Sequence, residues 1–184
     1  SFNRFQTGYI APLDGDVSVR GSRAGELIAR CIVETGTSSF YTALSKASKE
    51  PVLASVAHWI AADEFRHYKL FYDTLKTYLD AEGLGKLGRL KVAAGRIGET
   101  EDDELAYAYY AANIDPSQHY DRKSCIDAYI GTVCRFYDEP IIRRGNAMIL
   151  KAVGLPSNGM LAKLATRVAS RFVKAKADRY DRAV

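Results

Sequence analysis

A glutamate and a histidine lie three residues apart in the middle of a long predicted helix. The segment 61–68 reads A-A-D-E-F-R-H-Y and contains Glu64 and His67. At helical spacing the same stripe carries six apolar side chains: Leu53, Val56, Ile60, Phe71, Leu75 and Tyr78. Burying a carboxylate and an imidazole on an apolar face costs several kcal/mol unless their charge is compensated. A metal ion held by Glu64 and His67 would provide that compensation.

A third ligand is predicted at the same height on the preceding helix. Glu34 lies 15 residues before Lys49, the centre of the predicted hairpin, and Glu64 lies 15 residues after it. At about 1.5 Å per residue both carboxylates lie roughly 22 Å from the turn, side by side if the helices are antiparallel. Two alternatives stay open: Glu64 and His67 could form a surface pair beside Arg66, and Glu34 could be solvated.

The elements that must position these residues are all predicted to be helices of one domain, 1–184. Residues 1–21 are expected to form an extended N-terminal arm, and Ser22 is expected to cap the first main helix. Helices are predicted over about 22–47, 51–81, 85–98, 104–113, 121–152 with a bend at Pro140, and 160–183. In the last helix four apolar residues are expected to face inward: Leu161, Leu164, Val168 and Phe172.

Length, charge and cysteine content limit the functional classes. The 184 residues are 47% hydrophobic, which suffices for one sizeable core. No run of 18 apolar residues and no signal peptide is present in the sequence, so we expect no membrane partner and a cytoplasmic location. The three cysteines are expected to be reduced thiols. Residues 156–184 carry seven Lys or Arg against two Asp, and we interpret them as a solvated helix face rather than a nucleic-acid site.

The arrangement of Glu34 with Glu64-Phe65-Arg66-His67 resembles the first half-site of the ferritin-like di-iron carboxylate superfamily, in the style of rubrerythrin-like and acyl-carrier-protein desaturase-like members. The resemblance implies a ferritin-like four-helix bundle with a crossover helix, here followed by an additional C-terminal helix. It also implies one or two iron ions, with manganese as an alternative, and a small apolar or acyl substrate. A homodimer is one option for the assembly.

The family also implies a second half-site, which this sequence matches poorly. Glu104 is the candidate on the third helix and Glu139 the candidate on the fourth, but Ile142 stands where a histidine is expected. Around a turn near Gln118 the two glutamates differ in height by seven residues, about 10 Å along a helix. Arg143 could pair with Glu139 instead of a metal. Both a structural ion pair and metal ligation stay open here.

Two functional classes follow. In the first, Glu34, Glu64 and His67 hold iron in an oxidoreductase that activates dioxygen or peroxide, with Arg66 orienting the ligands; the activation of oxygen is implied by the resemblance. In the second, the bundle has lost di-iron catalysis and acts as a binding or assembly module. The imperfect second motif, Pro140 and Arg143 favour this alternative.

Overall fold

The computed structural model describes residues 2–8, 20–99 and 103–181, and this described part contains α-helices and no strand. The helices are α1 (Phe2–Gly8), α2 (Arg23–Ala47), α3 (Pro51–Glu82), α4 (Lys86–Gly98), α5 (Asp103–Asn113), α6 (Arg122–Cys134), α7 (Glu139–Ala152) and α8 (Met160–Asp181). The all-α fold class is therefore confirmed. The finer expectation, a ferritin-like four-helix bundle, stays a prediction. No helix of the described part is long and apolar enough to span a membrane.

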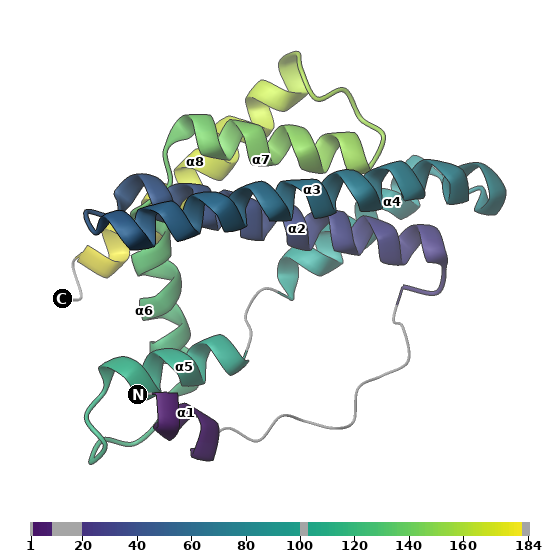
Figure 1. Ribbon diagram of the computed structural model, residues 1–184. Coiled ribbons are helices and arrows are strands. Elements are labelled where there is room, and N and C mark those ends of the chain that lie inside the picture. Colours follow the sequence, from purple (N-terminus) through teal and green to yellow (C-terminus); the bar gives the residue numbers. More distant parts are fainter. Residues whose placement is uncertain (1, 9–19, 100–102, 182–184) are drawn as a thin grey trace.

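The long hairpin of α2 and α3 is the element that positions the predicted ligands (Figure 1). The Ser22 side chain caps α2 by accepting a hydrogen bond from the Gly25 amide, as predicted. Glu50 caps α3, and Pro51 occupies its first turn. A backbone N–H has no intrahelical acceptor there, so the missing N–H of proline costs no hydrogen bond. The helix α3 ends at Glu82, and the capping residue Gly83 has a φ of 63°, which favours glycine. Residues at equal distances from the short turn therefore lie at equal heights.

Helix α7 packs against α2 where α2 carries small side chains. Ser38 and Ser39 are buried, and a methyl group on Gly145 of α7 would come within 3.3 Å of Ser39 Oγ. On the α3 side, the Tyr68 hydroxyl donates a 2.8 Å hydrogen bond to the Met148 carbonyl oxygen of α7. The small residues of α2 thus permit close helix approach, as predicted, and α7 covers one side of the hairpin.

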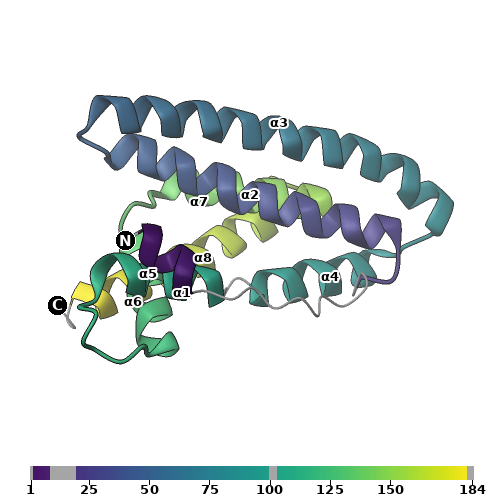
Figure 2. The same ribbon diagram turned by 60° about the horizontal axis from the view of Figure 1, so that its bottom comes forward.

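Two further helical groups complete the molecule. Helix α4 runs along α2 (Figure 2), and its buried Ala93 joins the core cluster formed by Ile28 of α2 and Leu75 of α3. Helices α5 and α6 share a separate tyrosine-rich cluster around Tyr110, and α1 packs against α5. Arg4 of α1 donates to the Ile114 carbonyl oxygen at 2.7 Å, and its guanidinium lies 4.2 Å from the centre of the Tyr110 ring.

The predicted bent helix over 121–152 is wrong, because two helices occupy this region. Helix α6 ends at Cys134 and α7 begins at Glu139. The Asp138 side chain accepts a 2.8 Å hydrogen bond from the Ile141 amide, which makes Asp138 the N-cap of α7. Pro140 lies in the first turn of α7, where its missing N–H leaves no intrahelical hydrogen bond unmade, so it starts a helix rather than bending one.

The predicted orientation of α8 is also wrong. The four residues expected to face inward are exposed: Leu161, Leu164, Val168 and Phe172. Helix α8 instead packs on α6 and α7 through its smaller side chains, among which Thr166 is buried and contacts Asn146 of α7 at 3.5 Å. Lys176 of α8 also pairs with Asp127 of α6 at 3.6 Å. Spacing alone identified the apolar stripe but not its neighbours.

The expectation for the N-terminus fails in part. Within the predicted extended arm 1–21, residues Phe2–Gly8 form the helix α1, which packs on α5. Residues 1 and 9–19 of the predicted arm lie outside the described residues. The packing of α1 is explained by its aromatic contact with α5, where the rings of Phe5 and Tyr107 lie 6.2 Å apart.

Candidate metal centre

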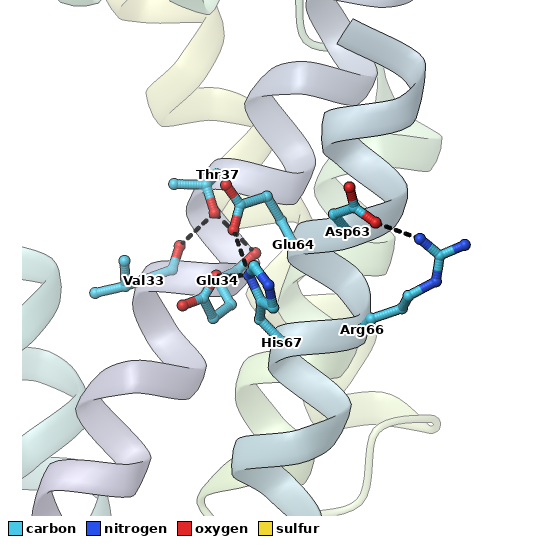
Figure 3. Close-up of polar contacts among 7 residues, drawn as sticks. All are labelled: Val33, Glu34, Thr37, Asp63, Glu64, Arg66 and His67. Carbon is cyan, nitrogen blue, oxygen red and sulfur yellow. Dashed lines mark hydrogen bonds and ion pairs between the residues drawn. The ribbon is translucent and has the colours of Figure 1, made fainter. Parts of the chain in front are cut away.

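Glu34, Glu64 and His67 gather between the middle of α2 and the middle of α3 (Figure 3). One potential ligand atom from each side chain lies within 4.8 Å of the other two. The equal heights that the sequence predicted for Glu34 and Glu64 are therefore realised in the hairpin. No other group of three His, Cys, Asp or Glu side chains within residues 2–8, 20–99 and 103–181 is this close.

The histidine ring turns one nitrogen toward both carboxylates. His67 Nδ1 lies 3.2 Å from Glu64 Oε2 and 3.7 Å from Glu34 Oε2. The Glu34 side chain is only 12% exposed, whereas His67 is 55% exposed, so the cluster is walled on the α2 side and open on the histidine side. Such a cluster has an entry path for an ion.

Burial leaves the charge of Glu34 poorly compensated. Loss of solvent, followed by a hydrogen bond to Glu64 and the negative charge of Glu64, raises the pKa of the Glu34 carboxyl from its usual value to about 7. The charges of His67 and Arg30 act in the opposite direction on this pKa. A cation between the carboxylates would replace the proton that Glu34 otherwise retains, which is the electrostatic environment expected of a metal site.

The distances fit one ion after small side-chain adjustments. Carboxylate oxygen and imidazole nitrogen bind transition metals at about 2.0–2.2 Å, so atoms bound to one ion lie roughly 3–4 Å from one another. The three ligand atoms of this cluster are within 4.8 Å. Closing the remaining distance requires rotation about the glutamate side-chain bonds. The residues therefore fit a single divalent ion with three protein ligands.

The inner side of the cluster is lined by groups that stay neutral. Burial, followed by the charge of Glu34, raises the pKa of the Cys31 thiol to about 12, so the thiol remains protonated near neutral pH and is a poor ligand. Burial also raises the pKa of Tyr68 well above its usual range, and its hydroxyl is engaged by the Met148 carbonyl oxygen. Only the three predicted side chains offer ionic ligand atoms here.

Arg66 does not orient the ligands as predicted. Its guanidinium pairs with Asp63 on the outer side of α3 and points away from the cluster (Figure 3). The sequence also missed two residues near Glu34. Arg30, one turn earlier on α2, lowers its pKa, and the Thr37 hydroxyl donates to the Val33 and Glu34 carbonyl oxygens. Their spacing of four and three residues from Glu34 was the available signal.

The structure does not bring the second pair of predicted ligands into a comparable cluster. Glu104 lies in the first turn of α5 and Glu139 in the first turn of α7, and both are exposed. Figure 1 shows α5 and α7 on opposite sides of the hairpin. No ion pair joins Glu139 to Arg143 in the described part of the chain, so the predicted structural pair is not formed either.

The resemblance of residues 137–143 to a second ligand motif has a simpler explanation. Asp138, Glu139 and Pro140 form the start of α7, with a capping aspartate, an acidic residue in the first turn and a proline. Lys46 at the end of α2 pairs with Asp138 at 3.0 Å. Lys46 lies 12 residues after Glu34, about 18 Å along a helix, so this motif is remote from the cluster.

Comparisons with known proteins identify no relative of this chain. No protein-family model matches the chain, and neither a curated protein nor a solved structure matches it. The cluster of Glu34, Glu64 and His67 is therefore the feature from which a function can be inferred.

Proposed function

We propose that the protein binds iron or manganese through Glu34, Glu64 and His67 and acts as a metal-dependent oxidoreductase on dioxygen or peroxide. The observation that carries this proposal is the convergence of three ligand atoms within 4.8 Å at mid-height of the α2–α3 hairpin. Two carboxylates and one imidazole form a ligand set that suits iron and manganese. Three protein ligands also leave coordination positions open for a small oxidant.

Each side chain has a distinct part in the proposed site. Glu34 provides the buried carboxylate, which gives up its proton when a cation arrives. Glu64 supplies the second oxygen ligand, and His67 presents Nδ1 from the exposed side. The neutral Cys31 and Tyr68 exclude water from the inner side. When bound, iron would supply the redox chemistry; the chain binds it, orients its ligands and holds one side dry.

A second candidate function is metal binding without dinuclear catalysis, in a binding or assembly module. It is favoured by the positions of Glu104 and Glu139, which do not provide a second half-site within the chain. Such a protein would hold one ion per chain and show no oxidant turnover. The two candidates share the metal site and differ in the reaction.

The test is the metal content of protein purified without chelators, measured by elemental analysis. We expect near-stoichiometric iron or manganese in the wild type and its loss in Glu64→Ala and His67→Ala. Glu104→Ala and Glu139→Ala are matched controls that should retain the metal, since both residues are exposed and lie in other helices. Consumption of hydrogen peroxide or dioxygen by iron-loaded protein then separates the oxidoreductase from the binding module. A wild type that stays metal-free after incubation with Fe(II) or Mn(II) would contradict the oxidoreductase and the single-ion site, and would support a binding or assembly module without a metal.

A further inference from the structure

Helix α8 carries a row of large apolar side chains on its outer surface. Four of them recur every three or four positions, and each is at least 47% exposed: Leu161, Leu164, Val168 and Phe172. Leu164 and Val168 each lie two residues from the buried Thr166, and two steps of about 100° place each of them nearly opposite to it on the helix. The Thr166 hydroxyl faces Asn146 of α7. The apolar row therefore points away from the helices on which α8 packs.

A row of basic side chains runs beside the apolar row. It consists of four exposed residues: Lys163, Arg167, Arg171 and Lys174. The first three directly precede a residue of the apolar row, so the two rows run side by side about 100° apart. Between Met160 and Ala177 the sequence contains no Asp or Glu. Within the described part of the chain, none of the four basic residues forms an ion pair with a carboxylate. Their charges are therefore available to a ligand.

The opposite flank of the apolar row is also basic at its end. Lys176 Nζ lies 5.8 Å from the centre of the Phe172 ring. The same nitrogen lies 3.6 Å from an Asp127 carboxylate oxygen of α6, which holds this flank against the rest of the molecule. The apolar row thus has cations on both sides near Phe172.

Both rows together match the surface of an anionic lipid bilayer. A helix with an apolar face and many Lys or Arg side chains lies in the plane of such a surface, where the apolar side chains enter the acyl region and the cations meet the headgroups. A nucleic acid would engage the basic row and leave the apolar row in water. The charge and the apolar surface of α8 therefore favour the bilayer over a nucleic acid.

The area of this face argues against a stable protein partner. At 22 residues α8 is about 33 Å long, and a strip about 10 Å wide along it offers roughly 330 Å². Stable protein interfaces bury roughly 800 Å² per partner. An interfacial helix, in contrast, binds a bilayer through one face of a single helix.

We propose that α8 binds the surface of an anionic lipid bilayer, with its apolar row inserted among the acyl chains and its basic row at the headgroups. The expectation of no membrane partner considered segments that span a membrane, whereas an interfacial helix needs only one apolar face. The proposal is independent of the metal centre, which lies between α2 and α3.

The first test is cosedimentation of the full-length protein with vesicles of phosphatidylcholine alone or mixed with an equal part of phosphatidylglycerol. The variant Leu164→Gln/Val168→Gln removes apolar surface from α8 without changing its charge. The control Val56→Gln/Leu70→Gln makes the same substitutions on α3, where Leu70 is 62% exposed against 58% for Leu164. We expect the wild type and the control to bind the anionic vesicles and not the neutral ones. The α8 variant should bind at least about 10-fold more weakly.

The second test removes charge from the basic row. The variant Lys163→Gln/Lys174→Gln is compared with Lys49→Gln/Lys69→Gln, which lowers the net charge equally at exposed positions elsewhere. Each cation at an anionic surface contributes roughly fivefold in affinity, so the α8 variant should bind about 10- to 30-fold more weakly. The control should change the affinity by less than about threefold, because its lysines are not in the basic row. Circular dichroism checks that each variant folds.

The third test measures insertion by tryptophan fluorescence. The chain has one tryptophan, Trp59 of α3, so the variant Trp59→Phe/Phe172→Trp places the only indole in the apolar row of α8. We expect its emission to shift to the blue when anionic vesicles are added, while the emission of the wild type stays unchanged.

Three results would overturn the proposal. The first is a wild type that stays in the supernatant with both kinds of vesicle. The second is binding that is lost in Lys163→Gln/Lys174→Gln but kept in Leu164→Gln/Val168→Gln, because charge alone then explains the adsorption. The third is binding of duplex DNA in place of vesicles, which would assign the basic row to a nucleic acid.

Discussion

Two segments of the chain carry a glutamate in a similar sequence context, and only one of them forms a cluster of ligands. Glu64 lies in the middle of α3, where it faces Glu34 of α2 and is followed one turn later by His67. Glu139 lies in the first turn of α7, between the capping Asp138 and Pro140. A glutamate in a helix interior can meet a partner helix at the same height, whereas one at a helix start serves the local backbone and dipole.

Metal affinity is the property that should differ most between the middle of α3, around Glu64, and the start of α7, around Glu139. Removing one of three ligands, as in Glu64→Ala, is expected to weaken Mn(II) binding at least about 100-fold, roughly 2.7 kcal/mol. Glu139→Ala should leave the affinity unchanged, since Glu139 is exposed and far from the cluster. Isothermal titration with Mn(II) at pH 7.5 measures both. Equal losses in the two variants would show that the α7 segment takes part in the site.

The buried Glu34 should make the free energy of unfolding depend on pH, whereas the exposed Glu139 should not. The pKa of Glu34 is raised from 4.5 to about 7, so the folded metal-free protein binds a proton more tightly than the unfolded chain between these values. The free energy of unfolding should therefore fall as pH rises from about 4.5 to 7, by roughly 1–3 kcal/mol, and level off above pH 7. Urea unfolding in a chelator at several pH values measures this fall.

The variant Glu34→Gln removes the titrating group and should abolish that fall, while Glu139→Gln should preserve it. Metal affinity should rise over the same pH range, because the ion must displace the Glu34 proton. A wild-type free energy of unfolding that stays constant from pH 4.5 to 7 would show that Glu34 titrates normally and is not buried as described.

The start of α7, around Asp138 and Glu139, should affect stability instead of metal binding. Asp138→Ala removes the hydrogen bond from the Ile141 amide and the ion pair with Lys46, and it is expected to lower the free energy of unfolding by about 1 kcal/mol. Thermal unfolding measures the loss. Because Asp138 can be replaced by Asn without losing a capping acceptor, Asp138→Asn should retain most of the stability, and neither variant should change Mn(II) affinity. A weaker affinity in either would connect the α7 start to the metal site.

Local signals in the sequence were sufficient for most helix boundaries and for the convergence of Glu34, Glu64 and His67. Ser22, Pro51 and Gly83 mark the ends of α2 and α3 through capping, ring geometry and left-handed φ, which act within a few residues. Once the turn is placed, the equal heights of Glu34 and Glu64 follow from helix rise alone. The direction of His67 follows from its spacing of three residues from Glu64.

The sequence was insufficient wherever the answer depended on which elements pack together. The spacing of Leu164 and Val168 defines a stripe on α8, but their exposure depends on α6 and α7 contacting the smaller side chains instead. The role of Pro140 depended on whether a helix runs through it or starts before it, and the capping Asp138 was the signal that decided this. Arg66 could have faced the cluster or Asp63, since both lie within one turn.

The most direct test of the metal centre is the position of a bound ion in a crystal of the protein soaked with MnCl₂. Anomalous diffraction near the manganese edge is predicted to show a peak about 2.0–2.3 Å from carboxylate oxygens of Glu34 and Glu64 and from a ring nitrogen of His67. No peak there, or a peak whose protein ligands come from other residues, would contradict the assignment.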